Sequence, residues 1–158
     1  MSVPYASSTS GLAARSEITA LLRKFGCESV GFMDVFEERA LVLAFRHRGH
    51  NIQLKASAKG WAQLYLEQNP WSRARKVNQQ QWQQKALDQG MVAVNSILRD
   101  WVKGQVTAIE CGVLSFEAVF MPYILADDGR PLMEHIERYM GQARLTDARG
   151  GADQRERL

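Results

Sequence analysis

The 158-residue sequence lacks the residues and segments that define several specialised classes of protein. It has only two cysteines, Cys27 and Cys111, so we expect reduced thiols rather than a disulfide framework. The longest apolar run, from Ala40 to Phe45, is far too short to cross a bilayer. The N-terminus has no basic segment followed by an apolar one, as a secretory signal would. We therefore expect no membrane association and a cytoplasmic location.

Signatures of catalysis are equally scarce. The sequence contains no Gly-rich phosphate loop, nucleophile elbow or paired-cysteine motif. His47 and His50 lie three residues apart, but arginines flank them in a glycine-containing stretch, which favours a surface loop over a metal site. His135 stands between Glu134 and Glu137, and a salt-bridged or solvated histidine explains it. We predict no metal and no cofactor.

One arrangement resembles the core of the restriction-endonuclease-like nucleases. In that core an acid and an acid-or-glutamine, any residue, lysine trio bind a metal and position water. Here Gln53-Leu54-Lys55 follows Asp34, and Glu17 precedes both. Gln-x-Lys on an alternating strand is also what a solvent-facing strand looks like, so a metal-dependent nuclease stands as the enzyme alternative.

The longest unbroken helical period runs from Gln81 to Cys111, and Gly112 follows as a natural terminator. Its apolar positions are Leu87, Met91, Val94, Leu98 and Trp101. A helix of that length spans about 45 Å, so it must cross the molecule or project from it. A projecting helix would leave its apolar face bare, which predicts a homo-oligomer formed through the long helix.

The remaining patterns predict an α+β domain. Period-two alternation predicts strands at 29–33, 40–45 and 51–56, which form a three-stranded antiparallel meander over residues 28–57. Leu41, Leu43 and Phe45 should face the core together with the long helix. A helical part over residues 58–141 completes a single domain that begins at residue 15. Residues 1–14 are expected to be a flexible arm and residues 142–158 a disordered tail.

Charge is divided along the chain. Nine basic residues and one acidic residue fall between Arg39 and Leu87, a net charge of +8, whereas eight acids and four bases give −4 between Asp88 and Ala143. The basic half also contains Trp71 and Trp61. Surfaces that bind nucleic acid typically combine cationic side chains, which contact phosphates, with aromatic rings, which stack on bases. The alternative is that both tryptophans are core residues and the charges only keep the protein in solution.

The candidate nucleic-acid-binding residues share this basic, aromatic composition. They are Arg46, Arg48, His50, Lys59, Trp71, Arg73, Arg75 and Lys76. Cationic side chains at these positions would neutralise phosphates, and Trp71 would stack on an unpaired base.

A family resemblance covers most of the chain. Its residues are Trp82, Ala86 and Leu87 on the long helix, then Gly112-Val113-Leu114-Ser115-Phe116-Glu117, Phe120-Met121-Pro122-Tyr123-Ile124 and Asp128-Gly129-Arg130-Pro131. With Lys24-Phe25-Gly26 and the Arg-x-Gly turn of the N-terminal half, these resemble uncharacterised small proteins encoded by temperate phages and prophages. The resemblance implies a mobile-element accessory protein in a bacterial host, and it carries no catalytic residue.

Three functional hypotheses follow. The first is a non-enzymatic phage protein that binds DNA or RNA through its basic centre. The second is an interaction protein that inhibits a host defence complex, of the anti-CRISPR type, using the acidic C-terminal half as a mimic of nucleic acid or the long helix as a docking surface. The third is the metal-dependent nuclease described above.

Overall fold

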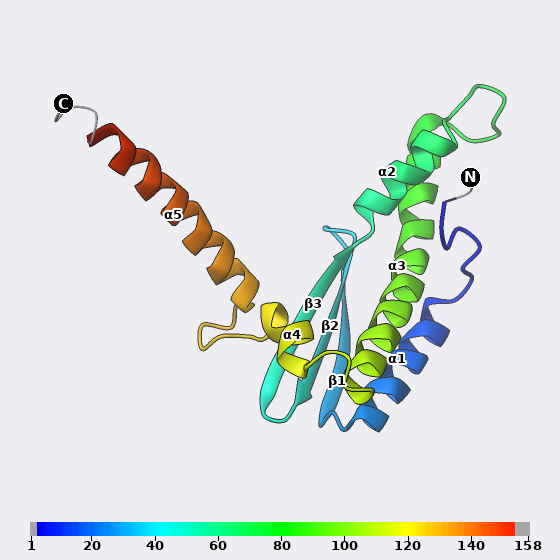
Figure 1. Ribbon diagram of the computed structural model, residues 1–158. Helices are drawn as coiled ribbons and strands as arrows, with labels where there is room; N and C mark the ends of the chain where they lie inside the picture. Colours follow the sequence, from blue (N-terminus) through cyan, green and yellow to red (C-terminus); the bar gives the residue numbers. More distant parts are fainter. Residues whose placement is uncertain (1–2, 154–158) are drawn as a thin grey trace.

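The computed structural model describes the backbone of residues 3–153 and the side chains of residues 3–143. Its elements are α1 (Gly11–Phe25), β1 (Ser29–Val35), β2 (Ala40–His47), β3 (His50–Ser57), α2 (Lys59–Gln68), α3 (Gln79–Glu110), α4 (Phe116–Phe120), the 3-10 helix η1 (Met121–Tyr123) and α5 (Leu132–Asp153). The predicted α+β class is confirmed, with the meander and one long helix (Figure 1).

The three strands pair antiparallel in the order β1-β2-β3. Two residues, Arg48 and Gly49, connect β2 to β3, and both have positive φ, at 49° and 81°. Positive φ at both central positions is the requirement of the tight hairpin turn whose twist matches that of the strands. The register therefore places His47 opposite His50 and Leu43 between Phe32 and Leu54.

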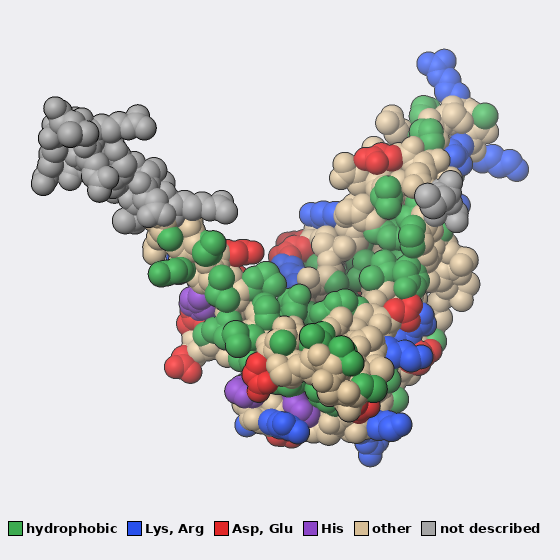
Figure 2. Space-filling view, in the orientation of Figure 1, with side chains coloured by type: hydrophobic (Ala, Val, Ile, Leu, Met, Phe, Trp, Pro, Cys, Tyr) green, Lys and Arg blue, Asp and Glu red, His purple; other side chains and the backbone are tan. Residues whose placement is uncertain are grey.

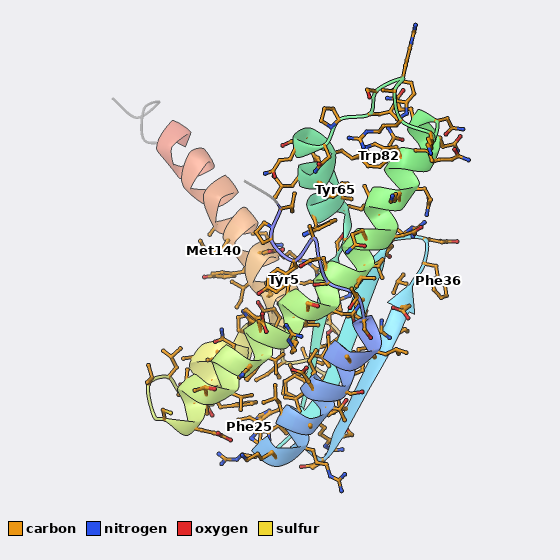
Figure 3. All side chains as sticks on the ribbon, turned by 90° about the vertical axis from the view of Figure 1, so that its right-hand side faces the viewer. Tyr5, Phe25, Phe36, Tyr65, Trp82 and Met140 are labelled. Atoms are coloured by element: carbon orange, nitrogen blue, oxygen red, sulfur yellow. The ribbon has the colours of Figure 1, made fainter. Side chains whose placement is uncertain are left out.

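One face of the sheet, here called the inner face, packs on α1 and α3 (Figures 1 and 3). Leu41, Leu43 and Phe45 of β2 are buried there with Leu98 of α3, and Trp101 is partly buried against the same cluster. These predicted core positions are confirmed. The long helix crosses the molecule with its apolar face covered, so it offers no bare surface for the predicted oligomer.

Residues 3–14 do not form the flexible arm predicted for positions 1–14, of which residues 1 and 2 lie outside the described part of the chain. Helix α1 begins at Gly11, because the Ser10 hydroxyl caps it by accepting from the Ala13 amide. Ahead of it, Val3 is only 3% exposed and the Tyr5 hydroxyl donates to Asp100 Oδ2 at 2.6 Å. The cap at Ser10 and the contacts of Val3 and Tyr5 with the body overturn that prediction.

The C-terminal part also differs from the prediction. Residues 142–158 were expected to be a disordered tail, yet α5 continues to Asp153. Residues 154–158 lie outside the described part of the chain. The helix leaves the body on the side of the sheet opposite α1 and α3, and its main contacts are with η1 (Figures 1 and 3). The fold thus has a compact body and one projecting helix.

A chain of partly buried polar contacts ties the body together. The Asn95 amide of α3 donates to the Met91 carbonyl and accepts from Arg15 Nε at 2.8 Å. Arg15 in turn binds Asp34 of β1 through two nitrogens, the shorter contact being 2.6 Å. A bidentate guanidinium-carboxylate pair fixes geometry as well as supplying energy. The network therefore fixes the positions of α3, α1 and β1 relative to one another.

Helices α2 and α3 approach closely at Gly90, where an added Cβ would force its neighbours to shift. A Cβ on Gly90 would lie 3.1 Å from the Ala58 carbonyl oxygen and 3.2 Å from the Ala58 Cβ, and Ala58 is fully buried. A Cβ on Gly104, about four helical turns further along α3, would meet nothing within 4 Å. Close packing against α2 therefore favours glycine at position 90, whereas no packing contact requires glycine at position 104.

We predict opposite effects for alanine at these two glycines. Gly104→Ala should raise the free energy of unfolding by up to about 1 kcal/mol, because alanine is the better helix former. Gly90→Ala should lower it, because the clash with buried Ala58 outweighs that gain. Urea denaturation followed by circular dichroism measures both, and stabilisation by Gly90→Ala would contradict the close approach.

Candidate nucleic-acid interface

The structure divides the predicted basic site between opposite ends of the body. Arg46, Arg48 and His50 lie at the β2–β3 hairpin, the hairpin end. Residues 69–78, the loop between α2 and α3, lie at the other end and carry Trp71, Arg73, Arg75 and Lys76 (Figure 1). We call this second region, together with the first two turns of α3, the loop end. No single surface contains all eight predicted residues.

The hairpin end is already partly neutralised. Arg46 Nε lies 3.0 Å from Glu28 Oε2, so this guanidinium has an ion-pair partner. His50 is exposed, with its ring 6.2 Å from that of Phe116. Of the predicted residues there, only Arg48 is a cation without an ion-pair partner among the described residues. The predicted residues of this end therefore offer a phosphate backbone one free cation, Arg48, although Arg23 and Lys24 at the end of α1 lie nearby.

The loop end is shaped by two tryptophans and an arginine. Trp71 Nε1 donates to the Val77 carbonyl at 2.8 Å, which closes the loop across six residues. Trp82 Nε1 donates to the Asn69 carbonyl at 2.8 Å, and the Arg75 guanidinium lies 3.8 Å above the Trp82 ring. These contacts engage three side chains with the loop itself. Trp71 is thus half-buried with its N–H engaged by the loop, and its role in base stacking stays a prediction.

The remaining cations of the loop end are free to meet a ligand. Arg73 and Lys76 are exposed and form no ion pair with any described residue, and Figure 2 shows basic side chains at this tip. Lys85 is exposed on the second turn of α3, with its amine 5.4 Å from the Trp82 ring. Glu67 is the one acid between residues 58 and 87. The loop end is therefore strongly and openly basic.

Helix α3 begins at the loop end and adds to its positive potential. Asn78 caps the helix through a capping box with Gln81, and its first turn contains no acidic residue. Partial positive charge collects at a helix N-terminus, so an anion near this turn is stabilised. The exposed amides of Gln79, Gln80 and Gln83 add hydrogen-bond donors beside the cations.

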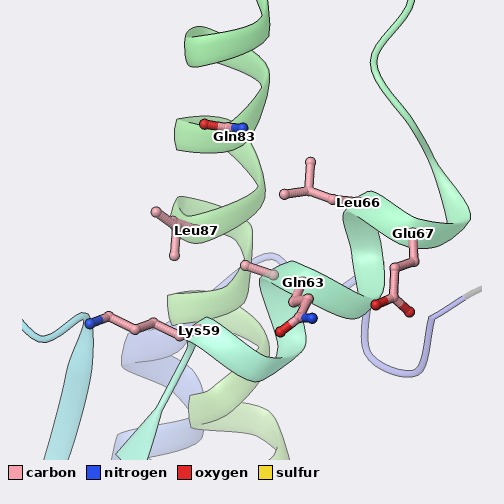
Figure 4. Close-up of a pocket in the computed structure, with 7 residues that line it drawn as sticks. Lys59, Gln63, Leu66, Glu67, Gln83 and Leu87 are labelled. Atoms are coloured by element: carbon pink, nitrogen blue, oxygen red, sulfur yellow. The ribbon is translucent and has the colours of Figure 1, made fainter.

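A hollow of about 490 Å³ lies between α2 and α3, next to the loop end (Figure 4). Leu66, Leu87 and Ala62 supply its apolar lining, and Lys59 and Glu67 carry its charges. Lys59 starts α2 and so lies roughly 15 Å from the loop along that helix. Its lining includes no histidine, cysteine or hydroxyl side chain that could act as a nucleophile.

The nuclease arrangement is not assembled. Asp34 faces the helices and pairs with Arg15, whereas Gln53 and Lys55 point to the opposite face of the sheet, where Lys55 forms an ion pair with Glu38. Alternate residues of a strand point to opposite faces, so Asp34 and the Gln-x-Lys pair do not converge. Among the described residues, no group of three or more His, Cys, Asp and Glu side chains could hold a metal.

His47 is a core residue, in contrast to the surface loop that its neighbours suggested. Its ring stacks on Phe25 at a centroid distance of 4.4 Å, and its Nδ1 lies 3.7 Å from the Cys27 Sγ. Burial, followed by the charge of Arg48, lowers the pKa of His47. His135 is salt-bridged, one of the two expected alternatives, but its partner is Asp128, whose Oδ2 lies 3.0 Å from His135 Nε2.

Comparison with protein-family models, with curated proteins and with solved structures gives no match to this chain. Within the described residues, no helix combines the length and the hydropathy needed to cross a membrane. The interpretation of the site therefore rests on its own geometry.

Sequence reasoning missed two residues of the loop end, Trp82 and Lys85. Lys85 was counted only in the net charge, and Trp82 only in the family resemblance; Trp82 is buried, and its ring supports Arg75 and Lys85. The signal was present in the spacing, because i and i+3 positions of a helix lie on one face. Applied to the start of α3, this rule places Lys85 beside Trp82.

The two cysteines should differ in reactivity. Burial raises the pKa of the Cys27 thiol to about 11, and the nearby Glu28 adds to this shift. Because the thiolate is the reactive form, Cys27 should react slowly at pH 7.5, whereas the exposed Cys111 should react first. Maleimide labelling followed by peptide mass spectrometry tests this order. Faster labelling of Cys27 would contradict its buried position.

Proposed function

We propose that the loop end binds nucleic acid through its phosphates, in a non-enzymatic protein. The observation that supports this most directly is the pair Arg73 and Lys76, which an ordered loop holds outward with no ion-pair partner among the described residues. A phosphate backbone takes its affinity from such cations and from the counterions they release. The accessory role in a mobile element is part of this proposal and rests on the sequence resemblance alone.

Within this proposal the residues have separate roles. Arg73, Lys76 and Lys85 contact phosphates directly, and the N-terminus of α3 adds favourable potential. Trp71 and Arg75 are positioning residues, because each is engaged with the loop backbone by a hydrogen bond. Contacts with the sugar-phosphate backbone do not depend on the base sequence, so we expect affinity for many sequences.

The first experiment reverses charge at the two ends in matched pairs. Affinity for a labelled oligonucleotide should fall with salt at a slope of about −0.9 per phosphate contact on duplex, and about −0.7 on single strands. Arg73→Glu with Lys76→Glu removes two contacts, which should flatten the duplex slope by about 1.8. Fluorescence anisotropy at several salt concentrations measures the slope.

Arg46→Glu with Arg48→Glu is the matched control, since it makes the same charge change at the hairpin end. It should leave the slope unchanged. If the hairpin-end variant alone flattens the slope, the binding surface has been placed at the wrong end. If the unmodified protein binds neither single strands nor duplex in a salt-dependent way, the proposal fails and a protein partner takes its place.

Trp71 provides a second test, which separates positioning from base stacking. Trp71→Phe keeps an aromatic ring but removes the N–H bound to Val77, a hydrogen bond worth about 0.5–1.5 kcal/mol to the loop. We expect weaker binding to single strands and duplex alike, measured by anisotropy on both. Retained binding in Trp71→Phe, with a loss confined to single strands in Trp71→Ala, would show that the ring stacks on bases instead.

A further inference from the structure

A row of ring contacts runs between α2 and α3 and ends at the loop end. Trp61 stacks on Tyr65 at a centroid distance of 5.4 Å, and Tyr65 meets Trp82 at 6.0 Å (Figure 3). The Arg75 guanidinium then lies 3.8 Å from the centroid of the Trp82 ring. Trp61 and Trp82 are buried, whereas Arg75 is partly exposed. Arg75 is therefore the layer at which this row reaches the surface.

The Arg75 side chain is held in place, but no acid of the chain neutralises it. Its Nε donates to the Pro70 carbonyl at 3.2 Å while the guanidinium covers the Trp82 ring. Arg75 forms no ion pair with any residue that the structure describes. A guanidinium is planar and stacks through its faces, and only one face of this group can lie against Trp82. The other face is available to a second flat group.

We propose that Arg75, in addition to its role in the loop, is a stacking platform for an unpaired nucleobase. The base extends the row of rings by one layer. This inference rests on the nucleic-acid binding proposed above and adds the form of the ligand, a single strand. Unpaired bases stack on arginine guanidinium planes as well as on aromatic rings. The bases inside a duplex are already stacked on their neighbours, so their faces cannot reach Arg75.

The neighbouring cations suit a nucleotide held in this way. Arg73 and Lys76 lie two residues before and one residue after Arg75, so their Cα atoms are at most about 11 Å apart. Both side chains are exposed and form no ion pair with a described residue. Phosphates on either side of the stacked base can each meet a cation. Every base has a flat face, so stacking tolerates many sequences, in agreement with binding directed at phosphates.

Oligonucleotides with and without bases test the platform. A single strand and an abasic strand of the same length carry the same phosphates, so a difference in affinity comes from the bases. The unmodified protein should bind the strand with bases roughly 2- to 30-fold more tightly, which is the range expected for a cation stacked on a ring. Fluorescence anisotropy at one fixed salt concentration measures both affinities.

Arg75→Lys is the decisive variant, because lysine keeps the charge but lacks the flat guanidinium. The cost of losing the Pro70 hydrogen bond falls on both strands alike, so the ratio of the two affinities isolates stacking. That ratio should fall to about one, whereas duplex and abasic strand should be affected equally. Arg73→Lys is the matched control, since Arg73 is exposed and lies over no described ring. It should keep the preference for bases.

The outcomes separate the platform from the proposed function. Salt-dependent binding with equal affinity for both strands leaves the phosphate contacts in place and overturns the platform. A preference for bases that survives Arg75→Lys, or that Arg73→Lys removes equally, places the stack elsewhere and also overturns it. Absence of salt-dependent binding to every oligonucleotide overturns the proposed function, and the platform with it.

Discussion

The burial of α3 along two of its sides is the constraint on which the rest of this structure depends. One side meets the inner face of the sheet through Val94, Leu98 and Val102, and another meets α2 at Gly90. Because the helix extends beyond the sheet, its two ends emerge in different surroundings. The C-terminal end reaches α4 and the turn before α5, and the N-terminal end supports the basic loop. The position of the proposed nucleic-acid surface therefore follows from one buried helix.

Much of the body could be predicted from periodicity, because burial on one face leaves a period in the sequence. The alternation around Leu41 and Leu43 and the helical spacing around Leu98 both gave the correct face. The N-terminal segment could not be predicted in this way. Val3 and Tyr5 are held by contacts with distant residues, such as the Tyr5–Asp100 hydrogen bond, and short segments of this kind have no period of their own.

For the candidate site as well, the sequence predicted the kinds of residue involved but not where the fold would place them. Composition identified a basic, tryptophan-containing centre, but sequence distance gave no indication that β3 and α2 would carry its two halves to opposite ends of the molecule. Trp71 illustrates a second difficulty. A tryptophan beside arginines is typical of base stacking, yet its N–H closes the loop here, and only a folded backbone reveals that partner. Binding by the loop end therefore depends on loop order as well as charge.

The central claim is that the buried helix α3 supports a loop end that binds nucleic acid. Hydrogen-deuterium exchange with and without a short oligonucleotide tests it most directly, because exchange rates report both on the burial of α3 and on the bound surface. The account predicts slow exchange over residues 91–106 in either state, together with new protection confined to residues 69–85 when the oligonucleotide is present. Protection at the hairpin residues 46–50 instead, or rapid exchange through the middle of α3, would contradict it.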